Sequence, residues 1–258
     1  MDDPSPAHST PLTASFTSFA GRPHPAALER RPEQVTMRTL VLGMFVSLDG
    51  FVSGPNGEVD WIFRSGDDAT DEWIVEHLWQ AGALAMGRRS YAEMAGYWPT
   101  SDTPFAAPMN AIPKIVFTRR GLIDTPGGRL DPSRTRDPGA SAGRDWTDPL
   151  VAQGDLRDEM ARLKAQPGKD IRALGGASFA QALAAHRLID EYHLLVAPVA
   201  LGQGVPLFAG LTRPLDLQLV STRVFAGGAV ALIYRTPVEA PGDPGGPDLA
   251  AGNPAGTA

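Results

Sequence analysis

Short apolar runs rich in β-branched residues alternate along this chain with segments of helical periodicity, and this alternation most constrains the fold. The first run, TLVLGMFVS at 39–47, is typical of a strand buried on both faces. Residues 67–82 follow as a helical segment with Ile74 and Leu78 on one face, and a short apolar run comes next at 83–87. Because parallel strands need a crossover between them, this order predicts an α/β fold.

The alternation continues through the chain and closes with two consecutive strands. The pattern predicts further strands at 113–118, 169–176 and 190–201 and further helices at 88–98, 155–168 and 177–188. Residues 216–225 and 229–236 are both strand-like and are joined by Ala226-Gly227-Gly228, a turn signal. The sequence therefore predicts a mostly parallel central sheet with an antiparallel C-terminal hairpin.

The two ends and one internal segment differ in composition from the rest. Residues 1–36 and 238–258 are rich in Pro, Gly, Ser, Thr and Ala without sustained periodicity, so we expect disordered extensions there. One folded domain is expected over residues 37–237. Within it, residues 124–149 are rich in Gly, Pro, Asp and Arg and are predicted to be a long loop or insertion.

Composition excludes several classes of function. The 258 residues contain no cysteine, which rules out disulfides, thiolate metal sites and cysteine nucleophiles. The formal charge of −6 disfavours nucleic-acid binding. No segment approaches the length of a membrane span, and no apolar leader precedes Met37, so a soluble cytoplasmic protein is expected. His77, His186 and His193 lack the spacing of metal ligands, and no metal site is predicted.

Three predicted strands end in residues suited to binding phosphate. The strand at 83–87 runs into Gly87, Arg88, Arg89 and Ser90, where cations at a helix start cost stability unless an anion is bound. The strand at 113–118 is followed by Thr118, Arg119 and Arg120. Surface arginines are the alternative explanation for both segments.

The third junction is ALGGASF. Gly175 and Gly176 permit close approach of a ligand to the backbone, and Ala177, Ser178 and Phe179 begin the next helix, whose free N–H groups favour an anion. A tight strand-to-helix turn explains this stretch equally well. Because ligands bind at the carboxyl ends of parallel strands, the three junctions together predict one extended ligand. A dinucleotide with an additional 2′-phosphate fits the arginines.

Two acidic residues follow the first strand. Asp49 precedes a glycine, so it belongs either to a turn or to a site where it positions a substrate or a proton relay. Asp60 lies next to Trp61, and such a pair can hold a heterocycle. A helix cap or a surface acid is the alternative for Asp60.

The segments SLDGFVSGPNGEVDW, MGRRSYAEM, KIVFTRR, LGGASFAQAL and LIDEYHLLVAPVALGQGVPLF, in this order, resemble the dihydrofolate-reductase-like superfamily. More narrowly, residues 37–237 resemble a stand-alone member of the RibD C-terminal domain family, the reductases of riboflavin biosynthesis. The resemblance implies a three-layer dihydrofolate-reductase-like fold, NADPH as hydride donor and a homodimer. It also implies that residues 87–90 and 175–179 bind cofactor phosphates and that residues 118–120 meet the adenosine 2′-phosphate.

The same resemblance assigns the acidic residues and the activity. Asp49 matches an aspartate near the nicotinamide and the substrate, and Asp60 with Trp61 is similar to the pair that holds the pterin in dihydrofolate reductases. The chain lacks their Met-Pro-Trp loop and also lacks a zinc deaminase domain. We therefore expect an NADPH-dependent reductase of a small heterocyclic, pterin- or pyrimidine-like, or carbonyl substrate. A non-catalytic nucleotide-binding module is the alternative, and a flavin-dependent reductase is a third.

Overall fold

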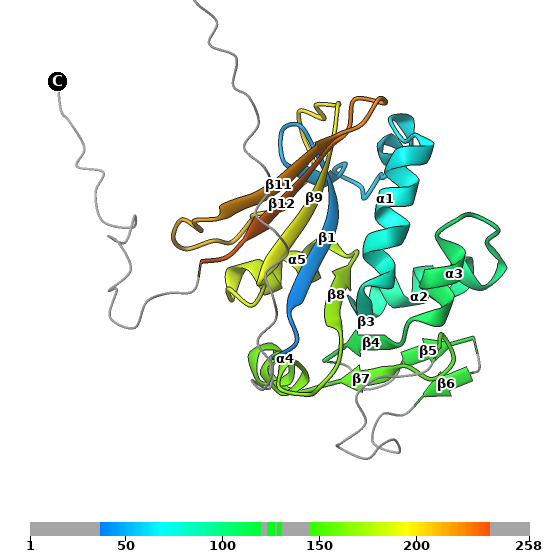
Figure 1. Cartoon of the computed structure of the whole chain (residues 1–258). Helices are drawn as coiled ribbons and strands as arrows, with labels where there is room; N and C mark the ends of the chain where they lie inside the picture. The colour runs from blue at the N-terminus through cyan, green and yellow to red at the C-terminus, as the bar shows by residue number, and fades with distance from the viewer. Residues whose placement is uncertain (1–36, 120–122, 127, 131–144, 238–258) are drawn as a thin grey trace, which may run out of the picture. The chain divides into compact units, whose positions relative to one another are not determined.

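The computed structural model describes residues 37–119, 123–126, 128–130 and 145–237 (Figure 1). The expected terminal extensions and Arg120 lie outside the described residues. The main sheet has eight strands: β1 (Leu40–Ser47), β3 (Ala81–Gly87), β4 (Lys114–Phe117), β7 (Leu150–Ala152), β8 (Asp170–Leu174), β9 (Glu191–Ala197), β11 (Gln218–Val224) and β12 (Val230–Arg235). Two smaller sheets pair β2 (Phe51–Ser53) with β10 (Val205–Pro206) and β5 (Ile123–Thr125) with β6 (Gly128–Leu130).

The strand order of the main sheet is β11-β12-β9-β1-β8-β3-β4-β7. Strands β9, β1, β8, β3, β4 and β7 pair in parallel, while β12 pairs antiparallel with both β9 and β11. At the centre, Leu42 of β1 is in register with Ala173 of β8 and Tyr192 of β9. The predicted mostly parallel sheet with an antiparallel C-terminal hairpin is confirmed.

Helices cover both faces of this sheet, which gives three layers (Figure 1). They are α1 (Asp68–Trp79), α2 (Arg88–Tyr97), α3 (Ala106–Ala111), α4 (Leu156–Lys164) and α5 (Ala177–Ala185), with 3₁₀ turns η1 (Asp60–Arg64) and η2 (Trp98–Thr100). Successive strand residues point to opposite faces. Thus Ala83 and Ala85 pack with α4 and α5, whereas Leu84 and Met86 pack with α1, α2 and α3.

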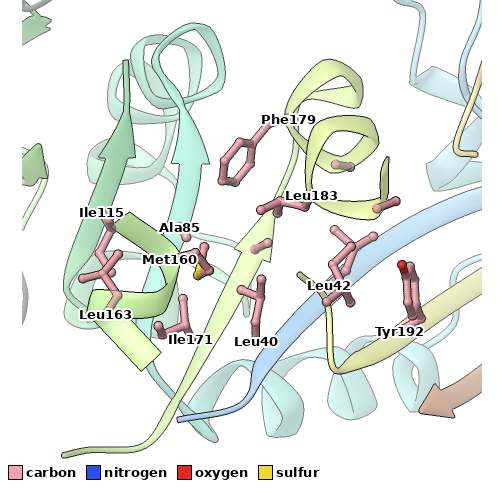
Figure 2. Packing of buried hydrophobic residues seen from close by; sticks show 14 of the residues in the cluster. Leu40, Leu42, Ala85, Ile115, Met160, Leu163, Ile171, Phe179, Leu183 and Tyr192 are labelled. Atoms are coloured by element: carbon pink, nitrogen blue, oxygen red, sulfur yellow. The ribbon is translucent and has the colours of Figure 1, made fainter. Parts of the chain in front are cut away.

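The core beneath α4 and α5 is continuous across the parallel strands (Figure 2). Leu40 and Leu42 of β1 lie in it with Met160 of α4 and Leu183 of α5, and these four side chains are at most 1% exposed. Full burial of each such side chain contributes roughly 1.5–3 kcal/mol. This packing fixes α5, and therefore the turn that precedes it, against the sheet.

Several short elements differ from the sequence prediction. The segment 124–149, predicted to be a loop, contains part of the β5–β6 hairpin, and β7 follows it at the sheet edge. The strand predicted at 190–201 ends at Ala197, one residue before a proline, which cannot donate a hydrogen bond to a ladder. Among the described residues, no helix is both long and apolar enough to cross a membrane.

Candidate functional site

The predicted phosphate-binding junctions lie on neighbouring parallel strands. Strand β3 lies between β8 and β4, and all three run in the same direction. Their carboxyl ends therefore share one edge of the sheet, and α2 and α5 begin directly after β3 and β8. The structure thus brings residues 87–90, 118–119 and 175–179 to one edge, as the three junctions predict.

The starts of α2 and α5 pack tightly together. Gly175 and Gly176 have φ values of +62° and +73°, which side-chain-bearing residues rarely adopt. A Cβ at Gly176 would lie 2.7 Å from Ser90 Oγ, and one at Gly175 would lie 2.9 Å from Met94 Cε. The two glycines therefore serve both the turn and the close approach of α2, so close packing alone is sufficient to require them.

Neither of these helix starts has a side-chain cap among the described residues. The N-cap residues are Gly87 for α2 and Gly176 for α5, which have no side chain that could accept a hydrogen bond from the first turn. By contrast, Asp67 caps α1 and Asp155 caps α4 through their carboxylates. Uncapped N–H groups and the helix dipole produce positive potential at the shared edge, which suits an anion.

The arginines at the start of α2 are exposed and differ in their partners. Arg89 Nε lies 2.9 Å from Glu93 Oε1, an ion pair on the helix surface. Arg88 has no hydrogen-bond or ion-pair partner in the part of the chain that the structure describes. Ser90 is buried beneath them, at 7% exposure, against the Gly175-Gly176 turn. Of the two arginines at the start of α2, Arg88 is therefore the one that is available to an anion at this edge.

The remaining predicted cofactor residues divide into core and surface positions. Thr118 is buried, and its backbone N–H donates to the carbonyl of Ala152 at 3.0 Å. Arg119 is exposed beside it. Phe179 packs on Phe117 with ring centroids 5.0 Å apart, so it anchors α5 to β4, while Ser178 is exposed in the first turn of α5.

Asp49 lies in the turn after β1 and is held by three donors. Ser47 Oγ donates to its carboxylate at 2.6 Å, and the backbone N–H groups of Gly202 and Leu201 donate at 2.7 and 3.1 Å. These hydrogen bonds, that of Ser47 foremost, lower the pKa of Asp49 to about 2. Asp49 is therefore an exposed, ionised carboxylate at neutral pH that also fastens the turn to a distant loop.

Asp60 and Trp61 lie in η1 and point to different environments. Asp60 Oδ2 lies 2.7 Å from Arg64 Nη2, and both side chains are exposed. The hydrogen bond from Arg64 holds the pKa of Asp60 below its usual value. Trp61 is 2% exposed and donates its indole N–H to the carbonyl of Glu58 at 3.2 Å. In this arrangement Trp61 anchors η1 in the core, and Asp60 faces solvent.

The loop that receives Asp49 was missed in the sequence analysis. Its functional groups are the backbone N–H groups of Leu201 and Gly202, so no side-chain type identifies them. The available signal was the Gly-x-Gly spacing of Gly202 and Gly204. A Cβ at Gly204 would lie 2.2 Å from the carbonyl oxygen of Ser53, so only glycine permits the loop to lie against β2.

The central sheet has helices on both faces and ends in an antiparallel C-terminal hairpin. This arrangement is the dihydrofolate-reductase-like fold of α/β proteins. The model of the RibD C-terminal domain matches residues 38–231, and the chain belongs to that family. It is 30% identical over 197 residues to YyaP of Bacillus subtilis, a protein of uncharacterized function, covering 76% of this chain and 94% of YyaP.

Solved structures show the same fold. A putative riboflavin biosynthesis protein from Shewanella sp. PV-4 superposes with a TM-score of 0.58 at 22% identity, over 78% of this chain and 99% of that chain. A bifunctional diaminohydroxyphosphoribosylaminopyrimidine deaminase/5-amino-6-(5-phosphoribosylamino)uracil reductase from Thermotoga maritima superposes with a TM-score of 0.53 at 13% identity. The match covers 78% of this chain and 57% of that longer chain. At these identities the superpositions show a shared fold.

Proposed function

We propose that this protein is an NADPH-dependent reductase that transfers hydride to a small heterocyclic, pterin- or pyrimidine-like, or carbonyl substrate. One observation carries the proposal. The uncapped starts of α2 and α5 pack against each other on neighbouring parallel strands, and Arg88 stands beside them without a partner among the described residues. A single diphosphate can accept hydrogen bonds from both helix starts, which is the arrangement that dinucleotide sites use.

The residues at this edge suit the parts of the cofactor. The first-turn N–H groups of α2 and α5, with Arg88 and Ser178, would hold the diphosphate. Arg119, exposed at the end of β4, would meet the adenosine 2′-phosphate, because guanidinium groups bind phosphate bidentately. Bound NADPH supplies the hydride, and the protein supplies orientation and electrostatics.

Asp49 is the proposed substrate-orienting carboxylate. Because its pKa is about 2, it does not carry a proton at neutral pH and cannot be the direct proton donor. Its role would be to accept a hydrogen bond from a substrate N–H or from a water that protonates the product. Asp60 is the alternative carboxylate, but its pairing with Arg64 occupies it, and its neighbour Trp61 contributes packing.

The solved relatives favour a pyrimidine-like substrate within this range. One is named for riboflavin biosynthesis and the other for reduction of a substituted uracil. Such heterocycles present N–H donors that an ionised carboxylate accepts. The expected cytoplasmic location and small-molecule substrate belong to the same proposal.

The proposal includes a homodimer, which the exposed edge strand β11 supports. All seven residues of β11 are exposed, and the strand ends the main sheet. Leu219, Val220 and Val224 are 51%, 46% and 74% exposed. Exposed apolar edge strands invite pairing with another chain, and a second copy of β11 would satisfy this edge.

A non-catalytic nucleotide-binding module remains the second candidate, and the hydrogen bonds of Asp49 favour it. Three donors already engage that carboxylate, which a purely structural role explains. The deciding experiment follows NADPH absorbance with pterin, pyrimidine and quinone compounds. Oxidation that depends on one of these substrates supports the reductase. Tight NADPH binding without turnover on any compound supports the module.

A further inference from the structure

A buried arginine lies on the α1 side of the sheet. Arg172 of β8 is 5% exposed and forms no ion pair with any residue that the structure describes. Its Nε has no hydrogen-bond partner in the same part of the chain. Its Nη1 makes only long contacts, 3.5 Å to the carbonyl of His77 and 3.4 Å to His193 Nδ1. An uncompensated buried charge destabilises the folded state, so its retention calls for an explanation.

The sheet is shaped to admit this guanidinium. A Cβ on Gly43 of β1 would lie 2.7 Å from Arg172 Nη2 and 2.8 Å from Nε. The missing side chain of Gly43 therefore provides the space in which the guanidinium lies. The carbonyl of His77 belongs to the last turn of α1, and the negative end of that helix dipole offsets part of the charge. Burial lowers the pKa of Arg172 to about 10, so it remains a cation at neutral pH.

The neighbouring ionisable groups do not neutralise Arg172. Glu191 is held by Arg235 at 2.8 Å and by His193 at 3.2 Å. Asp170 acts electrostatically on Arg38, whose side chain is also buried. Glu191 therefore already has a cation partner, and no ion pair joins Asp170 to Arg172 among the described residues.

The two histidines of the cluster are uncharged at neutral pH. Burial lowers the pKa of both His77 and His193, which keeps their rings neutral at neutral pH. Their rings pack edge-on, with centroids 5.3 Å apart. Arg172 is therefore the charged hydrogen-bond donor among the residues that line this cluster.

A pocket opens onto this cluster. Its polar lining consists of His77, Gln80, Asp170, Arg172, Glu191 and His193. Asp170 and Glu191 are the first residues of β8 and β9, and Gln80 follows the end of α1. The pocket therefore lies at the amino ends of the strands, at the opposite edge from the proposed cofactor site.

We propose that this pocket binds a small oxyanion, a carboxylate or an inorganic oxyanion, as the counter-charge of Arg172. Gln80 lies exposed at the pocket and supplies an amide N–H. Guanidinium is the group best suited to such ligands. The site does not depend on the proposed reductase activity, because it uses other residues at another edge of the sheet.

The test is an NMR titration of the full chain that follows the imidazole proton resonances of His77 and His193. Acetate and inorganic phosphate are the two probes, each added to wild type and to Arg88→Ala. The variant removes the arginine that phosphate would meet at the proposed cofactor edge. We expect saturable shifts of both histidines in both proteins. A response to acetate alone assigns a carboxylate ligand, and a response to phosphate alone assigns an inorganic one.

Two further variants connect the shifts to the pocket. Gln80→Glu places a carboxylate at the pocket and should weaken binding roughly tenfold. Ala161→Glu adds the same charge at an exposed position of α4, on the other face of the sheet, and should leave binding unchanged. Arg172→Met should abolish the shifts. If Arg172→Met does not fold, the comparison of Gln80→Glu with wild type still tests whether the probes bind in this pocket. Absence of histidine shifts with both probes, or shifts that Gln80→Glu does not alter, would overturn the proposal.

Discussion

The carboxylate of Asp49 lies 2.7 Å from the backbone nitrogen of Gly202, which is 153 residues further along the chain. This hydrogen bond joins the turn after β1 to the loop before β10, and Ser47 completes the arrangement from within the turn. The two segments flank the carboxyl end of β1, beside the edge where α2 and α5 begin. A carboxylate in this position connects the proposed substrate side to the proposed cofactor side.

Asp49→Asn is expected to lower turnover roughly 100-fold while leaving NADPH affinity nearly unchanged. The amide keeps the shape of the side chain but removes the negative charge that would orient the substrate. It also weakens the hydrogen bonds that the carboxylate accepts from the N–H groups of Leu201 and Gly202. Steady-state kinetics and NADPH titration measure the two quantities separately. Ser47→Ala, which removes one donor but retains the carboxylate, should have a smaller effect. Equal losses in turnover and NADPH affinity would contradict this role for Asp49.

Gly176→Ala is expected to destabilise the protein by about 1–2 kcal/mol, because alanine resists a φ of +73° and its Cβ would contact Ser90 Oγ. Urea unfolding measures the change. The double variant with Ser90→Ala should recover the part due to the contact but not the backbone strain. Gly96→Ala is the matched control. It lies in α2 with open space around its Cα, so it should be neutral or stabilising by roughly 0.5–1 kcal/mol.

Lys114 is expected to make the free energy of unfolding increase with pH in the alkaline range. It is fully buried, contacts the carbonyls of Ile112 and Asn110 and lies 4.5 Å from the ring centroid of Trp146. Burial lowers its pKa to about 8 from an ordinary value of 10.5. Between these two pH values the unfolded chain binds more protons than the folded protein, so stability rises with pH.

The expected rise is on the order of 2–3 kcal/mol across that window. Urea unfolding of wild type and Lys114→Met at a series of pH values isolates it, since other groups titrate in both proteins. The variant should lose the rise. An identical pH dependence in the two proteins would show that Lys114 does not titrate in this range.

A second copy of the chain is expected to cover β11. Val224→Lys and Val220→Lys place charges on the exposed edge strand, and edge lysines oppose strand pairing. Sedimentation velocity should show a dimer for wild type and a monomer for the double variant, with unchanged circular dichroism. A dimer that persists with both substitutions would show that the interface lies elsewhere. A monomeric wild type would show that the protein is not a homodimer.

Much of the sheet follows from local sequence patterns because its strands are buried. The run at 39–47 is apolar at nearly every position, since β1 lies at the centre of the sheet with helices on both faces. Elements of two or three residues, such as β2 and β10, have no periodicity to detect. Their pairing depends on Gly204 lying against Ser53, a contact between distant segments.

The sequence predicts the site residues that follow the ends of strands, but it does not predict which contacts a side chain makes with other parts of the chain. Arg88 and Gly176 follow apolar runs, so topology alone places them at one edge. Asp60 was expected near a ligand, but its carboxylate pairs with Arg64 four residues later, and sequence alone does not choose between these partners. Arg172 stands inside an apolar strand without a local signal, because the space that it occupies is created by Gly43 on another strand.

We expect the edge formed by the starts of α2 and α5 to bind NADPH. The most direct measurement is calorimetric titration of NADPH and NADH into wild type, Arg88→Ala and Arg157→Ala. Arg157 is an exposed arginine of α4 that contacts His186, so it controls for loss of surface charge. We predict that wild type and Arg157→Ala bind NADPH tightly, whereas Arg88→Ala binds it roughly tenfold to 100-fold more weakly. No binding of either nucleotide by wild type would contradict the account.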